Sequence, residues 1–219
     1  MEQTKIFTRV QELKKQLGER VSLVAAIKMQ SVEDINTAIL AGVDAIAENK
    51  VQEFRLKNHL LLDCPRHFIG HLQTNKVKYL IGKIALYHSC DRDALAQEIA
   101  RLSVKSAITS NVLLQINIGN EESKGGYAFD EAKEAFQRIS KLQGLRVKGF
   151  MAMLPNTDDE KRLRTLTQQM RQLFEWAKTQ SSEVEYLSMG MSGDYALCVE
   201  EGSNMVRLGS TIFGARNYQ

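Results

Sequence analysis

The sequence is poor in several residue types, and each shortage excludes a class of protein. Its three cysteines, Cys64, Cys90 and Cys198, are odd in number and form no C-x-x-C motif, so we expect neither a disulfide framework nor a zinc site. The charged N-terminus lacks the apolar segment of a signal peptide, and no apolar run approaches the length of a membrane span. These absences predict a cytoplasmic protein without a membrane partner.

An excess of charge of one sign is also missing. The formal net charge of +3 argues against a nucleic-acid partner, because such proteins usually carry a clustered basic face. Only two prolines are present, and no low-complexity linker divides the chain. With 43% hydrophobic and 25% charged residues, the composition is typical of a globular protein with a sizeable core. We therefore expect a single domain over residues 1–219.

Eight short apolar runs alternate along the chain with stretches of helical spacing. The first run, VSLVAAIK at 21–28, is followed by a helical pattern that Ser31 can cap. The later runs occupy 44–49, 66–70, 85–90, 111–118, 146–152, 185–190 and 204–209. Alternating strands and helices predict a parallel sheet, and eight such units predict a closed (β/α)8 TIM-type barrel of the α/β class.

An amphipathic pattern precedes the first run, with apolar residues at Ile6, Val10, Leu13 and Leu17. We expect this extra N-terminal helix to cover the gap left by the short tail after the last strand. The competing fold is a doubly wound open sheet, which normally has a G-x-G-x-x-G turn after its first strand. The corresponding segment, VAAIKMQSVED at 24–34, contains no glycine.

The strand ends collect polar residues. Because side chains alternate along a strand and the bulkier apolar set should face the helices, the last inward-facing residue of a strand can be assigned. This places Lys28, Asn49 and Asn117 at the ends of the first, second and fifth strands, and Arg207 inside the eighth. In barrels of this type the carboxyl ends of the strands form the active face.

Two turns rich in small residues, 190–193 and 209–210, follow the seventh and eighth strands. Barrel enzymes commonly bind phosphate at this place through backbone N–H groups. Ser192, Gly209 and Ser210 are suited to an anion, because glycine allows close approach and a helix is expected to begin at Ser192. For either turn alone, the alternative is structural, with Ser192 as a helix N-cap and Gly209 as a tight turn.

Lys28 and Arg207 each have two interpretations. Lysine at a strand end is often solvated, but burial beside Arg207 would lower the pKa of Lys28 and leave a nucleophilic amine. Arg207 is placed for an internal ion pair with Glu48 or for contact with a bound ring. An amine and a phosphate site in one mouth fit a Schiff-base enzyme acting on a phosphorylated substrate, or a pyridoxal phosphate site.

The remaining titratable residues indicate less. His67 and His71 flank the third strand, and we favour a hydrogen-bonded structural role over metal binding. Neither a Ser-His-Asp nor a Cys-His arrangement is recognisable. Glu121, Glu122 and Asp194 have two interpretations, as general acids or bases and as surface carboxylates, and we favour the second.

The chain resembles the pyridoxal phosphate homeostasis proteins, single-domain relatives of the alanine-racemase-type barrel. The resemblance extends from Lys28 to Arg216. It is carried, in order, by AAIK, AENKVQE, HFIGHLQTNK, QINIGNEESKGG, KGFMAM and LSMGMSGDYALCVEEGSNMVRLGSTIFGAR.

The resemblance implies pyridoxal 5'-phosphate held as a Schiff base on Lys28. The residues that it implies around the phosphate are Ser192, Gly209 and Ser210, with Arg207 facing the pyridine nitrogen and Asn49 beside the ring. The family is regarded as a carrier and regulator in vitamin B6 and amino-acid homeostasis rather than as a catalyst. Apo forms of pyridoxal phosphate-dependent enzymes are its expected recipients, and a monomer is the simplest expectation.

The chain departs from the family pattern at three places near the implied site. The family usually reads G-E-N-Y where this chain has Ala47 to Lys50, and has tryptophan where this chain has Arg66. It often has a proline soon after the lysine, where this chain has Met29 and Gln30. These changes bear on the affinity for the cofactor and on the shape of the mouth.

Two enzymatic alternatives remain open. One is a pyridoxal phosphate-dependent amino-acid racemase, which by the same resemblance would carry a further β-domain and a tyrosine from a partner as second base. The eight units account for nearly all of this sequence, so no β-rich segment remains, and no second base is recognisable. The other is a phosphosugar enzyme in which Lys28 bonds to the substrate itself.

Overall fold

The computed structural model describes residues 2–121 and 124–214, and strands alternate with helices along them as the sequence predicts. The strands are β1 (Ser22–Ala26), β2 (Ala45–Glu48), β3 (Arg66–Phe68), β4 (Leu86–Cys90), β5 (Ser110–Ile116), β6 (Leu145–Ala152), β7 (Tyr186–Ser188) and β8 (Met205–Leu208). The α-helices are α1 (Glu2–Leu17), α2 (Val32–Leu40), α3 (Val51–Lys57), α4 (Asp93–Lys105), α5 (Ala132–Ile139), α6 (Glu160–Gln180), α7 (Tyr195–Glu200) and α8 (Ser210–Phe213).

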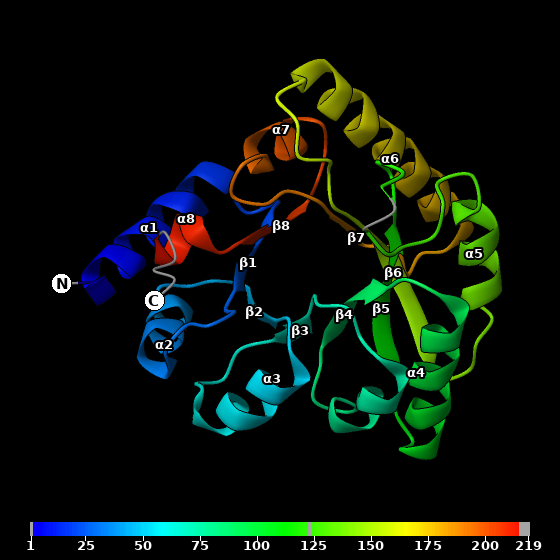
Figure 1. Cartoon of the computed structure of the whole chain (residues 1–219), viewed down its shortest axis with the longest axis horizontal. Helices are drawn as coiled ribbons and strands as arrows, with labels where there is room; N and C mark the ends of the chain where they lie inside the picture. The colour runs from blue at the N-terminus through cyan, green and yellow to red at the C-terminus, as the bar shows by residue number, and fades with distance from the viewer. Residues whose placement is uncertain (1, 122–123, 215–219) are drawn as a thin grey trace.

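The eight strands form a closed parallel barrel in chain order, ringed by the helices (Figure 1). Strand β1 pairs with both β2 and β8, which closes the ring. The predicted (β/α)8 barrel is confirmed. Two 3₁₀ helices, η1 (Asn58–Leu60) and η2 (Thr74–Tyr79), lie before and after β3.

The extra N-terminal helix is also confirmed. Its four apolar residues, Ile6, Val10, Leu13 and Leu17, are buried in one cluster with β8 and α8. Figure 1 shows α1 lying beside α8 and α2, where it covers the outside of the closing strands. In α2 the hydroxyl of Ser31 accepts a hydrogen bond from the N–H of Asp34 at 3.1 Å, so the predicted cap is present.

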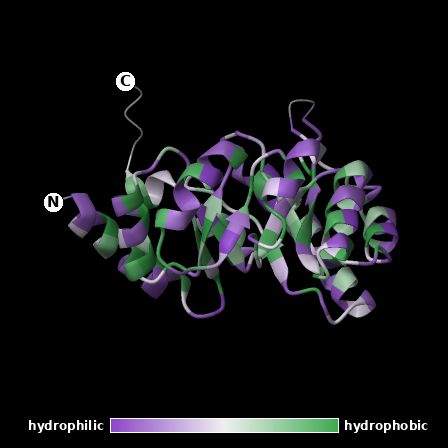
Figure 2. Ribbon diagram, turned by 90° about the horizontal axis from the view of Figure 1, so that it is seen from below, coloured by the Kyte–Doolittle hydropathy of each residue, from purple (hydrophilic) through white to green (hydrophobic). Residues whose placement is uncertain are grey.

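Side chains of each strand divide between two layers of core, following the period of two. Val24, Ala45 and Met205 lie in an inner cluster within the barrel, whereas Leu23 and Val206 pack outward against helices. Hydrophilic and hydrophobic residues alternate around the turns of the outer helices, as expected for helices with one face on a sheet (Figure 2).

Candidate functional site

A cavity of about 380 Å³ opens at the carboxyl ends of the strands. All six residues predicted for the site line it: Lys28, Asn49, Ser192, Arg207, Gly209 and Ser210. The other lining residues are Ala26, Ile69, Met151, Met153, Met191 and Gly193. Strand ends that are far apart in sequence are thus brought to one mouth.

Lys28 follows β1 in a tight turn that fixes its backbone. The next residue, Met29, has a φ of 62°, a conformation that is uncommon for residues other than glycine. The turn is held from α3, where the carboxylate of Glu53 accepts a hydrogen bond from the N–H of Met29 at 3.1 Å and Lys57 Nζ donates to the carbonyl of Gln30 at 2.9 Å. Lys28 is half-buried, and within the described part of the chain its amine makes no hydrogen bond or ion pair.

Asn49 is positioned from both sides. Its N–H donates to the carboxylate of Glu48, which is buried under α3, at 2.8 Å. On the other side, the loop after β3 passes so close that a Cβ on Gly70 would lie 2.0 Å from the carbonyl oxygen of Asn49. Only glycine permits this approach, so the backbone of Gly70 packs against Asn49 and fixes its position at the mouth of the cavity.

The two small-residue turns meet at the same side of the cavity. The hydroxyl of Ser192 accepts a hydrogen bond from the N–H of Thr211 at 3.3 Å, which joins the turn after β7 to the start of α8. A Cβ on Gly193 would meet no atom within 4 Å, so that position faces open space. Serine hydroxyls and backbone N–H groups around an open space are suited to an oxyanion such as phosphate.

The N-cap alternative for Ser192 is wrong, because helix α7 begins at Tyr195 with Asp194 as its N-cap residue. The turn at Gly209 is present: its carbonyl accepts hydrogen bonds from the N–H groups of Ile212 and Phe213, at 3.0 and 2.9 Å, at the start of α8. Asp194, expected as a surface carboxylate, accepts a hydrogen bond from the N–H of Met191 at 2.6 Å.

Arg207 lies in the floor of the cavity with only 5% of its surface exposed. Its guanidinium donates to the carbonyl and the hydroxyl of Ser188, at 2.8 and 2.6 Å, and to the carbonyl of Ala152 at 3.1 Å. Burial lowers its pKa to about 10, so it stays charged at neutral pH. The proposed ion pair with Glu48 is wrong, because that carboxylate faces α3 and bonds to the N–H groups of Asn49 and Lys50.

The sequence pattern missed a buried polar chain behind Arg207. Ser188 Oγ lies 3.1 Å from His88 Nδ1, and His88 Nε2 lies 3.0 Å from His67 Nδ1. Burial lowers the pKa of His67 to about 4 and the pKa of His88 well below its usual value. Both rings are therefore neutral at pH 7. The period-two pattern of β4 and β7 places His88 and Ser188 inward and was the signal available to find them.

Other expected residues lie away from the cavity lining. Asn117 turns back and ties its own loop, donating to the carbonyls of Glu121 and Lys124 and accepting from the N–H of Glu121. Glu121 pairs with Lys124. Glu122, like the final residue of the resemblance, Arg216, lies outside the described residues.

The departures from the family pattern also leave the cavity lining intact. Lys50 is exposed, with its amine 3.8 Å from the carboxylate of Glu53. Arg66 binds the side chain of Asn58 and the carbonyls of Leu61, Leu62 and Cys64, which fastens the segment before β3. Ala47 is buried in the inner cluster of the barrel.

The cavity thus combines a half-buried primary amine, a fixed cation and an anion-binding corner. Such a set can hold a small phosphorylated carbonyl compound, with the phosphate at one end and the carbonyl at the amine. Over residues 2–121 and 124–214, no three His, Cys, Asp or Glu side chains gather as metal ligands would. In the same residues, no helix is long and apolar enough to cross a membrane.

Comparison with known proteins places these features in a family. Residues 2–217 match the family model described as "Alanine racemase, N-terminal domain". A protein of Aquifex aeolicus named "Pyridoxal phosphate homeostasis protein" is 38% identical over 221 residues, which cover 98% of this chain and 97% of that protein.

Solved structures are similar over the same length. The structure titled as PipY of Synechococcus elongatus PCC7942 with PLP bound superposes with a TM-score of 0.86 at 29% identity, covering 95% of this chain and all of that one. Alanine racemase from Corynebacterium glutamicum has a TM-score of 0.82 at 16% identity and shares the fold, with 98% of this chain covering 62% of the racemase.

Proposed function

This chain belongs to the pyridoxal phosphate homeostasis protein family, and from that premise we propose that it binds pyridoxal 5'-phosphate in the cavity at the carboxyl ends of its strands. The observation that carries the proposal is the convergence of all six predicted residues on one cavity of about 380 Å³. A cavity of this size suits a small cofactor. We further propose that residues 1–219 form a single cofactor-binding domain.

The chemistry of the lining fits the group. Lys28 supplies the only primary amine of the cavity lining among the described residues, and we assign it the covalent bond to the aldehyde carbon, with loss of one water. Ser192, Ser210 and the backbone at Gly209 supply neutral donors to the phosphate. Gly193, which lines the same cavity, leaves space beside these donors.

Arg207 and Asn49 are assigned to the ring. The guanidinium is a permanent donor at neutral pH because its pKa stays near 10, so a ring nitrogen that faces it accepts a hydrogen bond and remains unprotonated. Asn49 lies beside the ring, in a position fixed by Gly70. When bound, the cofactor supplies an electron sink, and an unprotonated ring nitrogen weakens that sink.

We propose a carrier and regulator rather than a catalyst. Among the described lining residues, Lys28 and Arg207 are the only ionisable side chains; His, Tyr, Cys and carboxylates are absent from the lining. Racemisation needs a second group that moves a proton on the opposite face of the substrate, and this lining offers none. The racemase alternative is disfavoured on that observation. The names of the relatives favour the same choice.

The role in the cell follows as part of the proposal. Apo forms of pyridoxal phosphate-dependent enzymes would receive the cofactor from this protein in the cytoplasm, and the protein would act as a monomer. The cavity lies at the carboxyl ends of the strands, where such an exchange would take place.

An absorbance titration tests the binding. Adding pyridoxal phosphate to the purified protein should produce the band of a bound cofactor in the visible or near-ultraviolet range. Lys28→Ala should abolish that band, whereas Lys50→Ala, a nearby lysine that is exposed and outside the lining, should retain it. Equal bands in the wild type and Lys28→Ala would overturn the assignment of Lys28.

Proton exchange separates a carrier from a racemase. The loaded protein is incubated with single L-amino acids in deuterated water, and the α-proton signal is followed by NMR. We expect no exchange above the rate of free cofactor. Rapid exchange with one amino acid would establish catalysis and contradict the carrier assignment.

A further inference from the structure

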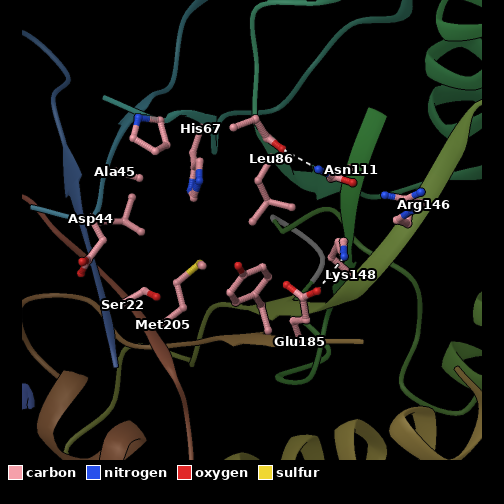
Figure 3. A pocket seen from close by; sticks show the side chains of 14 residues that line it. Ser22, Asp44, Ala45, His67, Leu86, Asn111, Arg146, Lys148, Glu185 and Met205 are labelled. Atoms are coloured by element: carbon pink, nitrogen blue, oxygen red, sulfur yellow. Dashed lines mark hydrogen bonds and ion pairs between the residues drawn. The ribbon is translucent and has the colours of Figure 1, made fainter. Parts of the chain in front are cut away.

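A second cavity lies at the opposite end of the barrel, at the amino ends of the strands. It has a volume of about 430 Å³ and is lined by the first residues of several strands, including Ser22, Ala45, Leu86, Tyr186 and Met205. Figure 3 shows His67 pointing into this space. We call it the lower cavity; no residue of the proposed cofactor site lines it.

A series of hydrogen-bonded polar side chains runs through the barrel from Arg207 to the lower cavity. A packed barrel interior is normally filled by branched apolar side chains, so a run of four hydrogen-bonded polar side chains is unusual. Here Arg207, Ser188, His88 and His67 are all buried and follow one another at 2.6, 3.1 and 3.0 Å. His67 is the last member and the one that lines the cavity.

The hydrogen bonds between these four side chains all donate in one direction, from Arg207 toward His67. Ser188 Oγ accepts from Arg207, and the only acceptor among its partners in the described residues for its own proton is His88 Nδ1. We therefore assign the proton of neutral His88 to Nε2, from which it donates to His67 Nδ1. With this assignment, a neutral His67 carries its own proton on Nε2. That N–H has no acceptor among the described residues, and it faces a cavity.

The walls of the lower cavity carry charges of both signs. On one side, Lys148 Nζ lies 2.7 Å from Glu185 and 2.9 Å from Glu183, and Arg146 Nε lies 3.3 Å from Glu183. On the other side, Asp44 pairs with Lys14 at 2.7 Å. In Figure 3, Asp44 and Ser22 lie across the cavity from Lys148 and Arg146.

The charges that line the cavity sum to zero. Asp44 and Glu185 balance Lys148 and Arg146, so a ligand with a net charge of either sign would gain little. A ligand with an anionic and a cationic end would add to both sets of ion pairs, its anionic end joining Lys148 and Arg146 and its cationic end joining Asp44. Its acceptor end would also receive the outward N–H of His67, in a charge-assisted hydrogen bond.

We propose that the lower cavity is a binding site for a small zwitterion of the α-amino acid class, with its carboxylate toward His67, Lys148 and Arg146 and its ammonium group toward Asp44. The site is separate from the proposed cofactor site and does not rest on it. Non-covalent contacts hold the ligand, and no bond is made or broken.

Imidazole NMR of the cofactor-free full chain tests the site directly. With ¹⁵N-labelled histidine, His67 and His88 should each show a protonated Nε2 and an unprotonated Nδ1 at pH 7. Glycine is then titrated, because without a cofactor aldehyde it can only bind non-covalently. We expect the Nε2 signal of His67 to shift in a saturable way, with acetate and methylammonium binding at least about tenfold more weakly.

A matched variant locates the ammonium end. Asp44→Asn keeps an oxygen for the N–H of Leu23, which Asp44 accepts at 2.7 Å, and removes the charge. It should weaken glycine at least about tenfold and leave acetate unchanged. An unshifted His67 signal with glycine, or acetate binding as tightly as glycine, would overturn the proposal. Because no cofactor is present, these outcomes are independent of the proposed cofactor function.

Discussion

The cavities at the two ends of the barrel differ in the charges that line them. At the carboxyl end, the described lining of the cavity contains two cations, Lys28 and Arg207, and no carboxylate. At the amino end, Lys148 and Arg146 on β6 are matched by carboxylates of the segment that precedes β7. We call the cavity at the carboxyl ends the upper cavity. Its net positive lining favours an anionic ligand, whereas the balanced lining of the lower cavity favours a ligand without net charge.

Position in a barrel therefore does not by itself define a site. Both cavities have similar volumes, about 380 and 430 Å³, and both are lined by inward-facing residues of the strands. What separates them is which polar groups already have partners. The amine of Lys28 makes no bond within the described chain, whereas Lys148 makes two ion pairs.

The largest expected effect is on the anion corner of the upper cavity. The double variant Ser192→Ala with Ser210→Ala should weaken pyridoxal phosphate more than about 100-fold, since hydrogen bonds to a charged group contribute about 1.5–3 kcal/mol each. Pyridoxal, which lacks the phosphate, should bind the variant and the wild type alike. Equilibrium titration of both proteins with both ligands measures the loss of affinity for pyridoxal phosphate and for pyridoxal. An equal loss for both ligands would mean that the serines act on the fold and not on the phosphate.

Lowering the pH should reduce the stability of the fold through the buried histidines beside the lower cavity. The pKa of His67 is about 4 in the folded chain and about 6.5 when unfolded, so the unfolded chain alone takes up this proton as the pH falls from 6.5 to 4. Stability is therefore lost over that window, by at most about 3 kcal/mol from His67.

Urea unfolding of the wild type and of His67→Asn, at pH 7 and at pH 4.5, isolates this contribution. The variant should lose less stability than the wild type on acidification, because carboxylate titrations are common to both chains. Parallel losses in the two chains would show that His67 titrates normally and is not held neutral.

Alanine substitutions at two glycines of the upper cavity should distinguish an effect on stability from an effect on ligand affinity. Gly70→Ala should cost about 1–3 kcal/mol of unfolding free energy, because the added Cβ would lie 2.0 Å from the carbonyl of Asn49. Gly193→Ala should leave stability unchanged, since no atom lies within 4 Å of its Cβ, but should weaken pyridoxal phosphate by filling the anion corner. Thermal unfolding and ligand titration on both variants provide the comparison. A stable Gly70→Ala would contradict the close approach.

The smallest effect is expected at Lys50, one of the departures from the family pattern. Its amine is 3.8 Å from Glu53 and its side chain is 57% exposed. Exposed pairs of this type contribute about 0–1 kcal/mol, so Lys50→Ala should change stability by less than about 1 kcal/mol. A larger change in urea unfolding would give this lysine a role in holding the turn after Lys28.

Strand periodicity predicted the upper cavity well, because the carboxyl end of each strand brings its last inward residue to a common mouth. Lys28, Asn49 and Arg207 were placed correctly by counting in steps of two. Asn117 was placed by the same rule, yet its side chain turns back to bond its own loop. A short amide can satisfy itself locally, and no periodic pattern reports that choice.

The lower cavity was not predicted, for a physical reason. His88 and Ser188 are single polar residues within apolar strands, and their significance arises only when β4 and β7 face each other across the barrel. The ion pairs of Lys148 likewise join β6 to residues more than 30 positions away. Contacts across a closed sheet depend on register, which the sequence alone specifies weakly.

The most direct test of the central claim is a peptide map after borohydride reduction of the protein loaded with pyridoxal phosphate. Reduction makes the bond between cofactor and amine permanent, and mass spectrometry then identifies the labelled lysine. We expect one cofactor per chain, carried by the peptide that contains Lys28, with Lys50, Lys124 and Lys148 unlabelled. Label on another lysine, or spread evenly over the exposed lysines, would contradict it.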